Sequence, residues 1–232
     1  MIVSIMQPYF FPYVGYFQLI AESDIFVFHD DVQYIKGGWV NRNIIINPDG
    51  ALLWIKLPVA AASHKLNINE RFYILNQEKD KMVRKIYNCY SRSANFHKRA
   101  SIFNNIMEFT NTNVADFNIN LIQSISEHLG CRTKFVRSSE IKGLGGLIGQ
   151  ARVIAICQNL GATRYVNPIG GAALYDAATF RVHGLDLRFF EASIACRPGD
   201  CPYLSIIHTL FCEGDGESLR GYGRDSADPP AN

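Results

Sequence analysis

The chain has 232 residues, of which 48% are hydrophobic and 19% are charged, and this composition predicts a globular protein with a sizeable core. Its formal net charge is +2 and its lysines and arginines are scattered, so neither nucleic acid nor a membrane surface is indicated as a partner. The sequence shows no secretory leader and no apolar run long enough to span a bilayer, so we expect a cytoplasmic protein without membrane insertion.

The N-terminal segment predicts the start of a parallel α/β sheet. Apolar residues 2–6 and 25–28 have strand character, and residues 14–21 have helical spacing between them. The connecting loop "QPYFFPY" combines two prolines with Gln7, Tyr9 and Tyr13, and Tyr16 follows in the helix. Loops after the carboxyl ends of parallel strands are where α/β proteins bind ligands. We therefore interpret these side chains either as part of a ligand site or as core packing around a turn.

The polar stretch "HDDVQYIKGGWVNRN" comes directly after the second strand and is the densest polar segment. Asp30 and Asp31 are adjacent, so in an extended chain they face opposite ways, and one can turn inward as a base or metal ligand while the other caps the turn. Lys36, Asn41 and Arg42 offer donors suited to carboxylate or phosphate. A solvated hairpin is the alternative interpretation. The next segment, "IIINPDGALLWIKLPV", predicts a hairpin around Asn-Pro-Asp-Gly.

The second half of the chain predicts helices followed by a return to α/β alternation. Residues 77–129 favour two or three helices, "TKFVRSSEI" and "RYVNP" favour strands, and a helix between them ends at Gly161. Gly170 and Gly171 then turn the chain toward a helix in "ALYDAATFRVHG", a strand in "LDLRFFE" and a helix in "YLSIIHTLF". The predicted fold is α/β, with a mostly parallel sheet of nucleotide-binding-like topology and a helical insertion in the middle of the chain. We divide the chain into residues 1–76, 77–130, 131–215 and a disordered tail, 216–232, within one compact domain.

Two further motifs bear on cofactors. The glycines of "KGLGGLIGQAR" do not form G-x-G-x-x-G, which argues against a Rossmann fingerprint, but this loop can present backbone N–H groups to an anion beside Ser139 and Glu140. The six cysteines lack a C-x-x-C pair, and the set Cys196, Cys201, His208 and Cys212 matches no standard zinc pattern, so we expect reduced thiols and no metal site.

Several blocks resemble the WbqC-like protein family, in the same order over about residues 1–213. They are "MQPYFFPYVGYFQLI", "DDVQYIKGGWVNRN", "SSEI", "GQARVIAICQNLGATRYVNPIGGAALY" and "YLSII". The chain departs from the family pattern at His208, where the family usually has an acidic residue, and in the short segment "ACRPGDC". The family is known chiefly from O-antigen and other surface-polysaccharide gene clusters, and the resemblance implies transfer of a glycyl or other small acyl group to a nucleotide-linked amino sugar. The order "PYVGY" is also similar to the H-x-G-H loop of nucleotidylyltransferases and adenylate-forming ligases, which implies ATP with Mg²⁺ as a possible cofactor.

These resemblances assign roles to residues of both halves. A base is expected among His29, Asp30 and Asp31. The expected substrate-binding residues are Gln7, Tyr9, Tyr13, Tyr16, Lys36, Trp39, Asn41, Arg42, Ser139, Glu140, Arg152, Asn167, Gly170 and Gly171. The alternative is a non-catalytic protein that binds a polysaccharide precursor or a neighbouring enzyme through the same aromatic and arginine side chains, without needing an acid or base.

Overall fold

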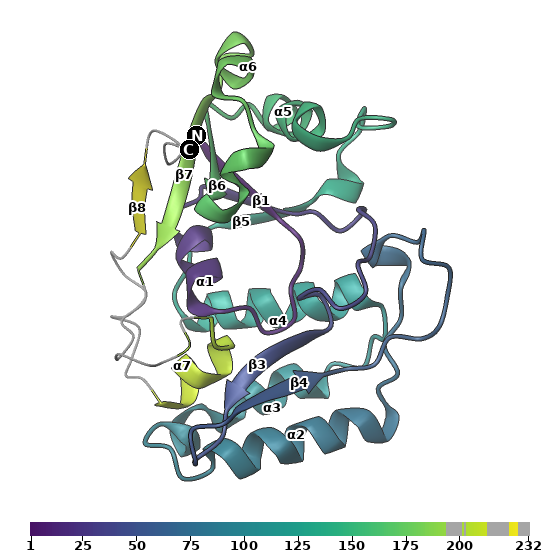
Figure 1. Ribbon diagram of the computed structural model, residues 1–232, viewed down its shortest axis with the longest axis vertical. Coiled ribbons are helices and arrows are strands. Elements are labelled where there is room, and N and C mark those ends of the chain that lie inside the picture. The colour runs from purple at the N-terminus through teal and green to yellow at the C-terminus, as the bar shows by residue number, and fades with distance from the viewer. Residues whose placement is uncertain (194–200, 202, 213–222, 227–232) are drawn as a thin grey trace.

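Parallel strands form the centre of the molecule in the order β5-β2-β1-β6-β7, and β8 pairs antiparallel with β7 (Figure 1). The computed structural model describes residues 1–193, 201, 203–212 and 223–226. The strands of this sheet are β1 (Ile2–Met6), β2 (Ile25–Phe28), β5 (Lys134–Arg137), β6 (Arg164–Pro168), β7 (Asp186–Ala192) and β8 (Gly223–Ser226). The predicted α/β class with a mostly parallel sheet is confirmed.

Helices cover both faces of this sheet. The helices are α1 (Val14–Ala21) and α4 (Val114–His128) on one face and α5 (Gly149–Leu160) and α6 (Ala177–Val182) on the other (Figure 1). Successive strand residues point to opposite faces: Phe26 joins the core that includes α1 and α4, and Val27 joins the core that includes α5 and α6. Both faces are therefore buried, which explains why these strands are continuous apolar runs.

The order of the strands creates a switch point between β1 and β6. From β1 the chain moves through α1 to β2 on one side, and after β5 it crosses through α5 to β6 on the other side of β1. The connections leaving β1 and β6 therefore run in opposite directions. In open α/β sheets such a point leaves a crevice beyond the carboxyl ends of the two strands.

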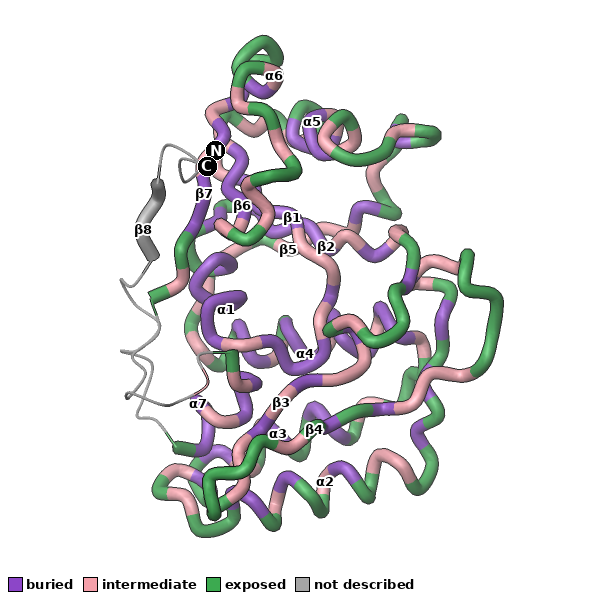
Figure 2. The backbone as a smooth tube through the Cα atoms, in the orientation of Figure 1, coloured by how far each residue is buried: buried purple, intermediate pink, exposed green. Residues whose placement is uncertain are grey.

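A hairpin and three further helices lie below the sheet in Figure 1. These elements are β3 (Arg42–Ile46), β4 (Leu52–Lys56), α2 (Asn76–Tyr90), α3 (Phe96–Glu108) and α7 (Ile206–Cys212). Figure 2 shows buried and exposed residues alternating along α2, whose inward side chains include Met82 and Ile86. With α4, the helices α2 and α3 account for the helical character predicted for residues 77–129. The reading of this region as an insertion and the boundaries at 76 and 130 stay predictions.

Local contacts explain where the elements differ from expectation. The helix expected from Ala173 begins only at Ala177, because the Asp176 carboxylate caps it by accepting from the backbone N–H of Thr179 at 2.8 Å. A 3₁₀ helix, η3 (Ile169–Leu174), precedes it, and two others are η1 (Ile68–Glu70) and η2 (Ser138–Glu140). Gly161 ends α5 with a φ of 72°, as its position predicted.

The C-terminal predictions are covered only in part. Gly223–Ser226, which the sequence placed in a disordered tail, forms β8, and the remaining residues from 216 onward lie outside the described residues. Most of the divergent segment "ACRPGDC" also lies outside them. Among the helices of the described ranges, none has the length and apolar character required to cross a bilayer.

Candidate functional site

A pocket of about 690 Å³ lies at the switch point between β1 and β6. One wall is the loop after β1 and another is the loop after β6, so the pocket occupies the crevice that the strand order predicts. We call it the switch-point pocket. Its lining residues are Ile5, Met6, Gln7, Tyr9, Pro12, Tyr13, His29, Trp39, Asn43, Asn167, Pro168, Gly170, Gly171, Leu174, Tyr175 and Tyr203.

The loop after β1 is packed on one side and faces the pocket on the other. Phe10 and Phe11 are fully buried, whereas the flanking Tyr9 and Tyr13 line the pocket. The Asn43 side-chain amide donates to the Phe11 carbonyl at 2.7 Å and to the Phe10 carbonyl at 3.1 Å. These bonds hold Phe11 at a φ of 43°, a left-handed conformation that costs a non-glycine residue ~1–2 kcal/mol. Both interpretations of this loop therefore apply in part: its phenylalanines pack in the core, and its tyrosines line the pocket.

Tyr16 belongs to the support of this loop. Its ring is almost completely buried in α1, and its hydroxyl donates to the Gln7 carbonyl at 2.9 Å. The ring therefore lies beneath the wall of the pocket, and Tyr16 is absent from the lining.

The loop after β6 is held from beneath by a buried amide. Asn167 accepts from the Tyr165 hydroxyl at 2.9 Å and donates to the Pro168 carbonyl at 2.8 Å. Gly171 passes so close that a Cβ there would lie 2.3 Å from Asn167 Nδ2, while a Cβ at Gly170 would meet nothing within 4 Å. Gly171 is thus needed for the close approach, and Gly170 borders open space.

His29 is the one predicted catalytic residue that lines the pocket. Arg152 Nε donates to His29 Nε2 at 3.2 Å, and because a guanidinium has no acceptor, Nε2 must be the unprotonated nitrogen. Burial, followed by the positive charge of Arg152, lowers the pKa of His29 against the opposing effect of the nearby carboxylates. The ring is therefore neutral at pH 7 with its proton on Nδ1, which has no hydrogen-bond partner among the described residues.

The two predicted acids take different structural positions. Asp30 is fully buried, and its carboxylate accepts from the Ser139 backbone N–H at 3.1 Å and from the Ser139 hydroxyl at 2.8 Å. Asp31 forms an ion pair with Arg152 and accepts from the Ser138 hydroxyl. Burial by itself raises the pKa of Asp31, but the hydrogen bonds from Ser138 and Arg152 outweigh it and hold this pKa below the ordinary value. Neither carboxylate lines the pocket.

Other predicted residues lie around the pocket or away from it. Trp39 is part of the lining, whereas Arg42 donates to the Gly37 carbonyl and stacks on Trp54. Asn41 donates to the Leu57 carbonyl at 2.9 Å, a bond that supports the hairpin. Lys36 and Glu140 are exposed and do not line the pocket.

Some lining residues were not predicted from the sequence. Tyr175 and Tyr203 lie in blocks that carry the family resemblance but were read only as structural elements. Asn43 is a buried amide beside the apolar run "III" of β3. A polar residue next to such a run could have been recognised from the sequence, because a buried amide requires hydrogen-bond partners.

The free polar groups of the pocket are all uncharged. The Gln7 amide, the Tyr9 and Tyr13 hydroxyls and His29 Nδ1 have no hydrogen-bond partner in the described part of the chain. Burial raises the pKa of Tyr9 and of Tyr13, so both stay protonated around neutral pH. No lysine, arginine, aspartate or glutamate is among the described lining residues. The pocket thus offers neutral donors and acceptors between aromatic rings.

The comparisons with known proteins identify the family of the chain. A family model described as "WbqC-like protein family" matches residues 7–218. The chain belongs to this family. The match begins at Gln7, the first loop residue after β1, so it includes nearly all of the pocket lining.

A relative of this WbqC-like chain is the "Uncharacterized protein Rv1507c" of Mycobacterium tuberculosis. It is 30% identical over 219 residues, which cover 91% of this chain and 94% of the relative. No solved structure matches the chain. His208 is a position at which the chain departs from the family pattern. Its Nδ1 lies 3.4 Å from the Tyr90 hydroxyl of α2, and the residue does not line the switch-point pocket.

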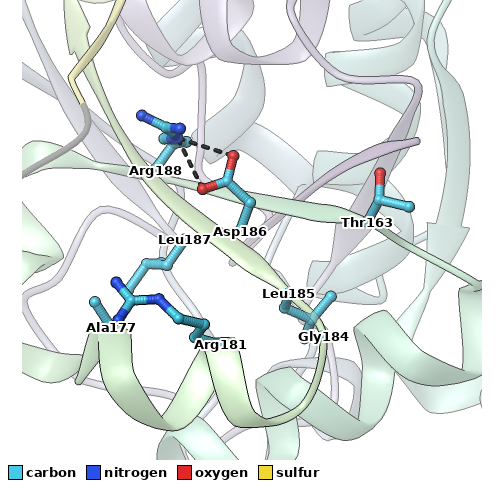
Figure 3. Close-up of a pocket in the computed structure, with 8 residues that line it drawn as sticks. All are labelled: Thr163, Ala177, Arg181, Gly184, Leu185, Asp186, Leu187 and Arg188. Carbon is cyan, nitrogen blue, oxygen red and sulfur yellow. Dashed lines mark hydrogen bonds and ion pairs between the residues drawn. The ribbon is translucent and has the colours of Figure 1, made fainter.

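A second pocket, of about 400 Å³, lies at the opposite ends of the strands, where α6 leads into β7 (Figure 3). Asp186 occupies it together with Arg188, whose Nε donates to both Asp186 oxygens at 2.9 Å, so this carboxylate is already neutralised. None of the residues predicted for substrate binding lines it. Within the described ranges, no three or more His, Cys, Asp or Glu side chains are grouped as metal ligands, and Cys196 lies outside those ranges.

Proposed function

We propose that this WbqC-like protein acts in surface-polysaccharide (O-antigen) biosynthesis and transfers a glycyl or other small acyl group to the amino group of a nucleotide-linked amino sugar. The observation that carries the proposal is the uncharged, aromatic pocket at the switch point, with His29 Nδ1 unpartnered in its wall. Tyrosine hydroxyls and an amide can each donate and accept, which matches the hydroxyl groups of a sugar.

An uncharged pocket also prepares the amino group for reaction. An ammonium ion entering it loses hydration, and no carboxylate lines the described wall to compensate, so the pKa of the bound ammonium falls. The sugar therefore binds as the neutral amine, and its proton is released to solvent. The pocket therefore removes the ammonium proton without a base, a step for which the sequence had suggested Asp30 or Asp31.

His29 then assists the acyl transfer. The amine lone pair attacks the acyl carbonyl carbon, a C–N bond forms, and the bond to the activating group breaks with its electron pair leaving on that group. The second proton of the nitrogen is lost to the leaving group or to solvent. As negative charge develops on the carbonyl oxygen, the Nδ1–H of His29 donates a hydrogen bond to it, and Arg152 holds the ring in the required tautomer.

The described lining does not fit ATP as the activating group. A triphosphate needs cationic or backbone donors, and Mg²⁺ is usually held through a carboxylate, but this lining holds no cationic side chain and no carboxylate. The pocket that would hold the reacting groups thus has no described carboxylate for Mg²⁺, and in this proposal the acyl donor arrives already activated, with no step through an adenylate formed by this chain.

A second candidate, non-catalytic binding of a sugar precursor, is favoured by one observation. The carboxylates of Asp30 and Asp31 are bonded to Ser139 and Arg152 and stay off the pocket. A binding protein needs the aromatic walls but not a hydrogen-bond donor aimed at a reacting carbonyl. The two candidates therefore differ in what loss of His29 does.

The test is a transfer assay with ¹⁴C-glycine presented as glycyl thioester, glycyl adenylate or glycyl-tRNA and a nucleotide-linked amino sugar as acceptor. We expect His29→Ala to lower turnover ~10²–10³-fold, the usual cost of removing one oxyanion donor, while sugar affinity changes little. His97→Ala, which alters an exposed histidine of α3, is the control and should leave turnover unchanged. Sugar binding without transfer from any of the donors favours the binding protein.

A further inference from the structure

The outward face of the β3–β4 hairpin continues the aromatic wall of the pocket. Trp39, at the pocket, stacks on Trp54 of β4 with ring centroids 5.9 Å apart and 27° between the planes. Trp39 and Trp54 are 40% and 42% exposed, which is unusual for so large an apolar side chain. Two adjoining tryptophan rings therefore lead from the pocket onto the surface.

One cationic side chain lies over these rings, and two more belong to neighbouring positions of the backbone. The Arg42 guanidinium lies 4.3 Å from the centroid of the Trp54 ring and donates to the carbonyl of Gly37, the residue after Lys36. Lys56 is the register partner of Arg42 across the hairpin and lies on the same face of β4 as Trp54. We call Lys36, Trp39, Arg42, Trp54 and Lys56 the tryptophan shelf.

The tryptophan shelf is cationic, whereas the described lining of the pocket is uncharged. None of the three shelf cations forms an ion pair with a described acidic residue, so their charge is available to a ligand. The pocket beside them holds no charged side chain in its described lining. Their junction is Trp39, which belongs to both.

We propose that the tryptophan shelf binds the nucleoside diphosphate part of the substrate while the sugar occupies the switch-point pocket. The base stacks on the exposed part of the Trp39–Trp54 pair that Arg42 does not cover, and Lys36 and Lys56 contact the phosphates, with the Arg42 charge beside them. A base presents a flat π-face to an indole, and arginine and lysine bind phosphate oxygens through charge-assisted hydrogen bonds. This inference rests on the proposed function for the choice of a nucleotide-linked sugar, but it assigns the nucleotide to residues outside the pocket.

The first test separates the two parts of the ligand by calorimetry. UDP, dTDP, ADP and GDP are titrated into the protein at 50 and 300 mM NaCl, and free glucosamine is titrated in parallel. We expect at least one diphosphate to bind and to weaken ~10-fold or more in high salt, because ion pairing with phosphate is screened. Glucosamine binding should change less than about twofold, because the pocket has no charge to screen. Failure of all four diphosphates to bind at millimolar concentration overturns the shelf.

The second test uses matched variants. We expect Lys36→Gln with Lys56→Gln to remove most of the salt dependence of diphosphate binding, whereas Lys81→Gln with Lys134→Gln, a change of equal charge on α2 and β5, should leave it intact. Trp54→Ala should weaken the diphosphate by ~5-fold or more through lost base stacking, and Trp54→Phe should restore part of it. Glucosamine affinity should be unchanged in all of these variants.

The outcomes distinguish the shelf from the proposed reaction. If the diphosphate binds the shelf and no acyl transfer occurs with any donor, the shelf stands and the transferase proposal fails. If transfer occurs but diphosphate affinity is the same in the lysine and tryptophan variants as in their controls, the shelf is refuted and the reaction stands. Circular dichroism melts of each variant show that a loss of binding does not come from unfolding.

Discussion

Gly170 and Gly171 allow a direct test of how closely the loop after β6 is packed. Alanine at Gly171 would place its Cβ 2.3 Å from Asn167 Nδ2, whereas alanine at Gly170 would meet no heavy atom within 4 Å. Neither glycine has a positive φ, so the backbone accepts alanine at both positions. The two substitutions are identical in chemistry and adjacent in sequence, and they differ only in what surrounds the added methyl group.

The expected cost comes from the buried amide. To admit the methyl group, Asn167 must turn and give up the hydrogen bond of 2.9 Å from the buried Tyr165 hydroxyl, which then keeps only its 3.3 Å contact with the Tyr175 hydroxyl. Loss of one such hydrogen bond costs ~0.5–1.5 kcal/mol, which for a chain of this size lowers Tm by about 1–6 °C. Gly170→Ala restricts the unfolded chain without a clash and should be neutral or stabilising by up to ~1 kcal/mol.

The measurement is thermal unfolding by circular dichroism, combined with sugar binding. Gly171→Ala should lower both Tm and affinity, and Gly170→Ala should retain Tm. In an Asn167→Ala background the Gly171→Ala substitution should cost much less, because the atom it strikes is gone. Equal Tm values for the two glycine variants, or the same cost of Gly171→Ala with and without Asn167, would refute the reasoning.

Three further predictions follow from the pocket and its supports. Arg152→Gln should raise the pKa of His29, because it removes the neighbouring positive charge, and an NMR titration of the imidazole that shows no rise would exclude Arg152 as a cause. The folded-state pKa of Asp31 lies below its ordinary value, so Asp31 stabilises the fold above that ordinary pKa, and this contribution is lost as pH falls through the folded pKa. Urea unfolding should therefore show that the Asp31→Asn variant loses less stability than the native protein between pH 5 and 2. Asn43→Ala should destabilise by ~1–3 kcal/mol, because it removes the donor to the buried Phe10 carbonyl, while the Phe11 carbonyl keeps only the Ser205 hydroxyl; a urea midpoint within error of the native value would contradict this.

Much of the fold was predictable because the decisive signals are local. The strand bounds Ile2–Met6 and Ile25–Phe28 and the helix bounds Val14–Ala21 agree with the sequence prediction, since prolines, polar residues and apolar period mark their ends. The start of α6 was missed because the expected helix ran through Asp176, whose capping role depends on a local turn that propensity alone does not reveal.

The site was predictable in its location but not in its roles. Residues after β1, β2 and β6 were expected near a ligand because loops that follow the carboxyl ends of parallel strands are where α/β proteins bind ligands. Which side chain faces the pocket depends on residues far along the chain: Ser139 binds Asp30 across 109 positions and Arg152 contacts His29 across 123. The expectation that Asp30 and Asp31 face opposite ways was wrong, because both carboxylates accept from the Ser138 hydroxyl. The chain leaves the extended conformation after Phe28, where β2 ends, so the alternation of a strand does not apply to them.

The arrangement behind His29 explains how a polar site can keep an uncharged wall. Arg152 carries a permanent positive charge, and placed alone beside the pocket it would attract anions into it. Its ion pair with Asp31 offsets part of that charge, while its Nε remains bonded to His29. The pair therefore fixes the imidazole tautomer and moderates the charge behind the pocket, a combination that an arginine or an aspartate alone would not provide. In the two proposals above, a phosphate binds Lys36, in the loop before the hairpin, and Lys56 on β4, and a neutral sugar fills the space between the tyrosines.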